Sequence, residues 1–329
     1  MGKRNKKRQP PLMSPEIENR KSLPPLLLTV HYMRRGCHTI YRPLKGETQN
    51  LRIPILVNKY IMASTHGWLV LADRCQGDCL LWNASSQDMI KLPRLQSFDS
   101  YGKCVLSKPP TEPDCHILFS SADLLQQAFC RIGDVEFVYQ SRIKEDDQLV
   151  AIASFQEKIY GVMSNDFEFV TIEFVGRTIE FRPILINDDQ PLKAPVIKKN
   201  WLMWKECALI DSHTDELLFV LKDLTQNSIL DGSEFKVFRV DINRMECIEI
   251  DDIGDQVILT GQYGTAFCCP SSGTTFKPNS IYYVLEFHTC VYVYDLDDKS
   301  TSSWLPPHDV VGLHNLNHFW VTSPPRISR

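Results

Sequence analysis

The sequence predicts an all-β fold, a β-propeller of six or seven blades in which each blade is a four-stranded antiparallel sheet. Short apolar runs rich in β-branched and aromatic residues recur along the chain, bounded by Gly, Pro, Asn, Asp or Ser. This pattern is typical of strands joined by turns. No long amphipathic helical pattern separates the runs, and they group into a repeating unit. The alternative all-β layout is a pair of stacked sandwiches, which the repeat disfavours.

The repeating unit is clearest between residues 60 and 93. A strand, a tight turn containing Gly67 and a second strand are expected in Tyr60–Asp73. A polar turn then leads to a strand in Cys79–Asn83, and the chain returns as Met89–Pro93. The same succession of strands and turns is expected in three later stretches: His116–Tyr139, Leu149–Phe174 and Cys207–Ile250.

The stretch Asp251–Trp304 is the last copy of the unit. Strands are predicted in Val257–Leu259, Ile281–Val284 and Val291–Tyr294, and a turn after Asp295 leads into a final strand. We read Ile253-Gly254-Asp255 as a corner in which Gly254 supplies backbone freedom and Asp255 supplies local hydrogen bonds.

The spacing of four anchor turns supports a propeller. These turns, at Asn83, Asp134, Asp241 and Asp295, lie 51, 107 and 54 residues apart, and one unit fits between the middle pair. A four-stranded propeller blade occupies ~40–50 residues. Closing such blades into a ring hides the sheet edges that would otherwise recruit other chains.

Composition and charge exclude several classes of partner. The 329 residues are 43% apolar and 23% charged, with a net charge of −4. Five basic residues lie in the first eight positions, so residues 9–329 carry 31 − 40 = −9. An acidic body matches nucleic-acid phosphates poorly, and no apolar run approaches the ~18 residues of a membrane span. We therefore expect neither a nucleic-acid partner nor a membrane partner.

Three regions are expected along the chain. Residues 1–22 form a flexible basic and Pro-rich segment, residues 23–310 the propeller, and residues 311–329 a C-terminal tail or a ring-closing segment. The first segment holds a possible nuclear-import signal, with a solvated terminus as the alternative reading; its residues are Lys3, Arg4, Lys6, Lys7 and Arg8. The 11 cysteines are scattered and follow no signal peptide, which favours a reducing compartment, cytoplasmic, nuclear or both.

No catalytic, cofactor-binding or metal-binding constellation is expected. Cys75 and Cys79 lack a second ligand pair of the kind that zinc requires. His66 is read as a turn residue whose ring bonds a backbone carbonyl, with Trp68 in the core. Phosphate-binding and dinucleotide-binding glycine motifs are absent, as is the nucleophile-elbow pattern. His308, His314 and His318 are read as part of an exposed polar tail.

An ordered series of segments resembles the plant F-box-associated β-propeller family of the KIB type. The segments that carry the resemblance are Leu26–Leu44, Ser64–Leu71, Leu81–Ser85, Ile90–Pro93, Pro113–Ser120, Arg131–Asp134, Ile253–Val257, Lys277–Val284 and Val293–Leu296. The resemblance covers about residues 23–310. It implies a propeller, and it implies the role of the substrate-recruiting half of a ubiquitin-ligase adaptor.

The chain departs from this family at its start. An F-box is a helical module of about 40 residues, whereas only 22 residues precede the matched region here, and three prolines in the first 15 disfavour helices. Docking to a ligase scaffold is therefore not expected of this chain alone.

The sequence favours a non-enzymatic protein-interaction module of unidentified partner. Two polar connections, Asp188–Lys199 and Asp223–Glu234, are the candidate recognition loops. Two alternatives stay open: a full ubiquitin-ligase adaptor whose F-box lies upstream, and a propeller enzyme such as a hydrolase.

Overall fold

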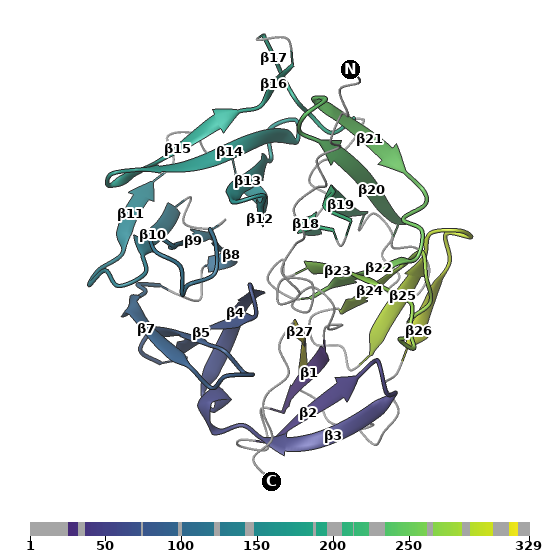
Figure 1. The fold of residues 1–329 in the computed structure, drawn as a ribbon, viewed down its shortest axis with the longest axis horizontal. Helices are drawn as coiled ribbons and strands as arrows, with labels where there is room; N and C mark the ends of the chain where they lie inside the picture. The colour runs from purple at the N-terminus through teal and green to yellow at the C-terminus, as the bar shows by residue number, and fades with distance from the viewer. Residues whose placement is uncertain are drawn as a thin grey trace, which may run out of the picture.

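A computed structural model shows six β-sheets arranged as blades around a central axis (Figure 1). The structure describes residues 26–31, 37–73, 75–97, 101–121, 126–141, 148–186, 189–195, 206–212, 214–223, 234–261, 266–284, 290–304 and 316–321. Structural statements below refer to these residues. The fold is a six-bladed β-propeller, which confirms the predicted class and settles the blade number at the lower of the two values.

Blade one is built from both ends of the described chain. Its strands, from the axis outward, are β27 (Leu316–Val321), β1 (Leu26–His31), β2 (Cys37–Arg42) and β3 (Glu47–Arg52). All six residues of β27 pair antiparallel with β1. The segment 311–329, left open between a tail and a ring-closing role, thus contributes the strand that closes the ring, and His318 lies in that strand.

Blades two to five are continuous antiparallel meanders of four strands. Blade two, preceded by the short 3-10 helix η1 (Pro54–Leu56), contains β4 (Lys59–Thr65), β5 (Trp68–Asp73), β6 (Asp78–Trp82) and β7 (Met89–Arg94). Blade three contains β8 (Tyr101–Leu106), β9 (His116–Ser121), β10 (Gln126–Arg131) and β11 (Val138–Ser141). Blade four contains β12 (Leu149–Phe155), β13 (Lys158–Met163), β14 (Glu168–Val175) and β15 (Thr178–Pro183). Blade five contains β18 (Glu206–Asp211), β19 (Leu217–Asp223), β20 (Glu234–Asp241) and β21 (Glu246–Ile250).

Blade six departs from the simple meander. It contains β22 (Gln256–Thr260), β23 (Ala266–Pro270), β24 (Ser280–Val284), β25 (Val291–Asp295) and β26 (Thr301–Trp304). Their order is β23-β22-β24-β25-β26, so β22 lies between the innermost strand and β24. β22 runs parallel to β24, whereas the other pairs of the blade are antiparallel. The sequence predicted strands at the positions of β22, β24, β25 and β26, but it missed β23.

Six hydrophobic clusters fill the spaces between neighbouring blades. Each cluster takes side chains from two adjacent sheets. In blade one, the neighbours Leu27 and Leu28 point to opposite sides, the first toward blade six and the second toward blade two. This alternation is the period-two pattern of a strand buried on both faces. Every blade therefore depends on both neighbours for its burial.

Three of the four anchor turns share one hydrogen-bonding device. Asn83, Asp241 and Asp295 each stand at or just after the end of the strand that pairs with the outermost strand of its blade. The side-chain oxygen of each accepts bonds of 2.9–3.0 Å from backbone N–H groups two or three residues later. Such Asx turns fix the reversal locally. Asp134 instead accepts from the N–H of Arg131, three residues earlier, at 2.9 Å.

The corner before β22 has the predicted glycine, but its local hydrogen bond is accepted by a different aspartate than predicted. Gly254 has a φ of +67°, which confirms its predicted role. The local hydrogen bond, however, runs from the Gly254 N–H to the Asp252 carboxylate at 2.7 Å. The Asp255 carboxylate accepts instead from the Ser271 hydroxyl, and the Asp255 carbonyl accepts from the Ser271 N–H at 2.9 Å. These bonds tie the chain before β22 to the end of β23.

Trp320 provides a direct test of ring closure. Its side chain is 0% exposed, and its Nε1 donates to the carbonyl of Thr260 in blade six at 3.2 Å. We expect Trp320→Ala to lower the free energy of unfolding by about 3–5 kcal/mol, because it empties a large buried site at the closing strand. Urea titration of the variant and of the unchanged chain measures this difference in the free energy of unfolding. Val135→Ala, at a side chain 93% exposed, is the control, and an equal effect of both changes would contradict the closure.

Candidate functional site

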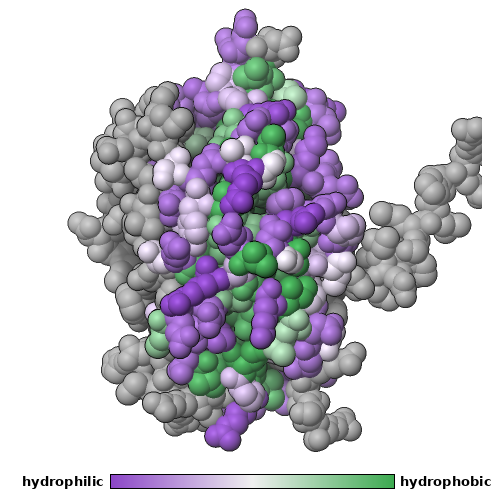
Figure 2. Space-filling model, turned by 90° about the vertical axis from the view of Figure 1, so that its left-hand side faces the viewer, coloured by the Kyte–Doolittle hydropathy of each residue, from purple (hydrophilic) through white to green (hydrophobic). Residues whose placement is uncertain are grey.

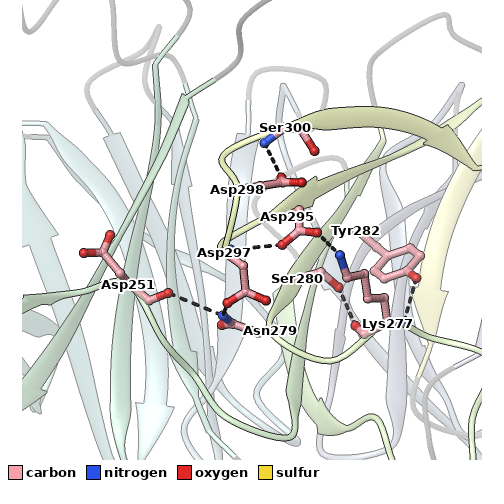
Figure 3. A network of polar contacts seen from close by, with 9 residues as sticks. All are labelled: Asp251, Lys277, Asn279, Ser280, Tyr282, Asp295, Asp297, Asp298 and Ser300. Atoms are coloured by element: carbon pink, nitrogen blue, oxygen red, sulfur yellow. Dashed lines mark hydrogen bonds and ion pairs between the residues drawn. The ribbon is translucent and has the colours of Figure 1, made fainter.

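A network of polar contacts lies at one corner of blade six (Figure 3). Asn279 stands at its centre. Its Nδ2 donates to an Asp297 carboxylate oxygen at 2.6 Å, and its Oδ1 accepts from the Ile253 N–H at 3.0 Å. Its own N–H bonds the carbonyl of Gln256 at 3.0 Å. One buried amide therefore ties together the chain before β22, the start of β24 and the turn after β25.

The charged groups of this network are held in fixed pairs. Lys277 binds the nearly buried carboxylate of Asp295, and Lys299 binds Asp251. The hydrogen bond and charge of Lys299 lower the pKa of Asp251, and hydrogen bonds from Ser300 lower the pKa of Asp298. Carboxylates stabilised in this way stay ionised near neutral pH and do not serve as general acids. The cluster is a structural clamp.

Asn279→Ala tests the clamp. The change leaves the buried Ile253 N–H without its acceptor, and we expect the free energy of unfolding to fall by about 1–3 kcal/mol. Asn243→Ala, at an exposed asparagine in the turn of blade five, is the matched control. If denaturant titration found the two variants equally stable, the network would not be holding the corner.

Two histidines that could serve as bases are held in structural contacts. His66 follows β4 in a turn with a φ of +48°, and its ring bonds the backbone of Leu106. This confirms the predicted turn role, and Trp68 is buried as expected. His116 stacks on Phe174 of blade four, with ring centroids 4.3 Å apart and planes at 11°. Its Nδ1 lies 3.0 Å from the Asp114 carbonyl oxygen.

Desolvation lowers the pKa of both rings, so the neutral form is favoured in the folded chain. Backbone hydrogen bonds partly oppose this shift.

Burial also affects several of the described thiols. Burial raises the pKa of Cys79, Cys130, Cys247 and Cys269 to about 12 in each case. A thiol with such a pKa is protonated at neutral pH and is a poor nucleophile. Within the described part of the chain, no group of three or more His, Cys, Asp or Glu side chains is placed to hold a metal ion.

The histidine shifts predict a pH dependence of stability. Because both folded pKa values lie below 6.5, the unfolded chain binds protons first as the pH falls. This contribution to stability is fully present above pH 6.5 and is lost as the pH falls through the folded pKa values. Urea titrations at pH 7.5 and 5.0 should show a smaller loss of stability in the double variant His66→Gln, His116→Gln than in the unchanged chain. Equal losses would contradict the assignment.

Several sequence expectations fall outside the described residues. These include the five basic residues of the possible import signal, namely Lys3, Arg4, Lys6, Lys7 and Arg8, together with His308 and His314. Most of the candidate loop Asp223–Glu234 also lies outside, since only its two ends, in β19 and β20, are described. No helix within the described ranges is long and apolar enough to cross a bilayer.

Of the other candidate loop, Asp188–Lys199, the structure describes residues 189–195, and its role in recognition stays a prediction. A small hairpin, β16 (Leu185–Ile186) and β17 (Gln190–Pro191), follows β15 and projects beyond the ring (Figure 1). The chain then returns to blade four, where the N–H of Ala194 bonds the Phe167 carbonyl at 3.2 Å. Leu192 and Ala194 are buried in this return, although prolines and charged residues flank them in the sequence.

The base of the hairpin is firmly fixed. Phe169 exchanges backbone hydrogen bonds with both sides of the insertion, at 3.0 Å with Ile184 and at 2.9 Å with Leu192. Ile184 and Leu192 are themselves joined by a bond of 2.7 Å between the Leu192 N–H and the Ile184 carbonyl. The hairpin is therefore an insertion into the outer edge of blade four whose two ends meet.

A strained turn lies under this insertion. Phe167 has a φ of +51° although it is a buried aromatic residue, and the preceding Asp166 has a φ of +63°. The Phe167 ring packs against Phe219 of blade five at 5.8 Å between centroids, and Lys193 binds Asp166 at 3.1 Å. Such backbone strain costs about 1–3 kcal/mol per residue and concentrates at functional positions.

The architecture defines the class, a six-bladed β-propeller with a fixed hairpin inserted at the rim of one blade. The family model described as KIB1-4 beta-propeller matches residues 40–315. The chain belongs to this family. A search of curated proteins finds no significant match.

Two solved structures are similar to this chain at low identity. One is the virginiamycin B lyase from Staphylococcus aureus, in a catalytically inactive form with quinupristin: 11% identity, 77% of this chain and 72% of that chain covered, TM-score 0.39. Another is a chain of a nidogen/laminin complex: 10% identity, 85% and 93% covered, TM-score 0.41.

Proposed function

We propose that this chain is a non-enzymatic β-propeller that binds other proteins. The observation that carries the proposal is the state of the groups that hydrolytic chemistry would need. Desolvation lowers the pKa of His66 and His116, whose rings bond backbone carbonyls, and burial raises the pKa of the Cys79 and Cys130 thiols. Carboxylates of blade six are tied to lysines and N–H groups. Acid–base and nucleophilic catalysis require such groups to converge on a reacting atom.

The surface supports a protein as the partner. The body is acidic, which disfavours nucleic acid, and membrane binding finds no support in the apolar pattern. Ten of the 11 cysteines are free thiols, which supports a reducing compartment, the cytoplasm or the nucleus. Recruitment of substrates to a ubiquitin ligase is the particular form of this role that the F-box-associated resemblance implies.

Capture of partners from cell extract tests the proposal. The purified full chain, immobilised and cross-linked to bound proteins, should retain a reproducible set that survives nuclease treatment. Heat-unfolded chain is the matched control, because the proposal assigns binding to the folded ring. The same preparation should show no turnover of ester, peptide or glycoside substrates above the unfolded control. Specific turnover, or a bound set that disappears with nuclease, would contradict the proposal.

A ligase scaffold among the retained proteins would support the adaptor form of the role. Cell fractionation followed by immunoblotting tests the compartment, and recovery in the secreted fraction would overturn it.

A further inference from the structure

We infer that the β16–β17 hairpin of blade four is the docking element of this propeller, and that it engages a protein surface on which an apolar or aromatic side chain is flanked by a lysine or arginine. The inference rests on the proposed function and names the site and the partner chemistry.

The hairpin presents apolar side chains at a projecting position. Leu185 is 40% exposed and stands opposite Pro191 in the hairpin register. Pro183, just before the hairpin, and Pro195, just after its return, are exposed as well. Figure 2 shows this projection at the top of the molecule, with hydrophobic surface directly beneath a hydrophilic tip. An apolar side chain of a partner gains burial by packing against the cross-strand pair of Leu185 and Pro191.

Recognition here must work through side chains. Each hairpin strand has two residues, and an added strand needs a longer edge with regular donors. Pro191 in β17 and Pro183 at the end of β15 lack an N–H group. These prolines block backbone pairing, so the hairpin cannot recruit a partner as an extra strand. The cross-strand pair of Leu185 and Pro191 is then the contact that remains available.

Acidic residues near the hairpin indicate that the partner's apolar side chain is flanked by a cationic residue. Asp189 is exposed at the described tip. On the adjoining outer strands, Arg182 pairs with both Glu173 and Glu180, at 3.0 and 2.8 Å. These four residues sum to 1 − 3 = −2. A cationic side chain next to the apolar anchor complements this charge, and charge complementarity selects among partners that share an apolar anchor.

The fixed base of the β16–β17 hairpin lowers the entropy cost of binding a partner. Ile184, Leu192 and Ala194 anchor both ends of the insertion in the core between blades four and five. The strained turn at Phe167 is held beneath it by the Ala194 N–H. Because the hairpin base is already fixed, a partner does not bear the full entropy of ordering it.

A phage-displayed library of random 12-residue peptides tests the inference on the full chain. The unchanged protein should enrich peptides in which Trp, Phe, Tyr or Leu lies beside Lys or Arg. Leu185→Asp should weaken binding of the enriched peptides at least tenfold. Asp189→Lys should weaken it severalfold, with a smaller loss at high salt because surface charge is screened. Met89→Asp, at a side chain 62% exposed on blade two, is the matched control and should bind normally.

A second variant separates a loss of binding from a loss of folding. Replacing residues 185–191 with two glycines joins Ile184 to Leu192, whose backbones are already hydrogen-bonded, so the ring should keep its unfolding midpoint while peptide binding is lost. Peptides of other chemistry, no enrichment, binding indifferent to Leu185→Asp, or a self-association that depends on Leu185 would each overturn the inference. If the glycine variant still captures the full set of cellular proteins, the hairpin role fails while the interaction function stands.

Discussion

Burial of both faces of every blade is the constraint on which the rest of the structure depends. Each of the six clusters lies between two sheets, so a blade with a missing neighbour would expose one whole apolar face. The ring therefore has to close, and β27 closes it by pairing along all of β1. Leu27 and Leu28 show how tightly this is specified, since a register slip of one residue would exchange the two faces. Stability becomes a property of the whole ring.

That constraint also determines where function can lie. Alternating strand residues are consumed by the clusters between blades, and several described turns are closed by their own side chains, as at Asn83, Asp241 and Asp295. What remains for recognition is the rim and the longer connections. The insertion in blade four stands out because its base is part of the core, whereas Leu185 and Asp189 reach solvent. Its strained Phe167 turn is sustained by the packing around it, as functional strain generally is.

The strands of blades two to five were largely predictable because each apolar run records burial on both faces. Gly254 was correctly placed, since a corner between two strands needs a positive φ. The polar outer strand β3 and the inner strand β23 were missed, because a solvent-facing edge and an axis-facing edge carry weak apolar patterns. The parallel pairing of β22 with β24 depends on how the chain enters the ring, which is not encoded locally.

The candidate site was predicted only in part. The sequence pointed to residues 188–199 as a recognition loop, but it did not distinguish exposed Leu185 from buried Leu192. The two leucines differ because the backbone of Phe169, in strand β14, hydrogen-bonds both sides of the insertion at Ile184 and Leu192. Such a contact between strands is not visible in the local sequence. The prolines at positions 183, 191 and 195 were the available signal, because a residue without an N–H group is confined to strand ends, edges and bulges.

The most direct measurement is site-specific photocrosslinking in cells, with a photoreactive phenylalanine analogue placed at Leu185 or, separately, at Met89. We expect a discrete protein adduct from position 185 and none from position 89, where the side chain is the more exposed of the two. Adducts of equal intensity from both positions, or an adduct from position 89 alone, would contradict a docking role for the hairpin.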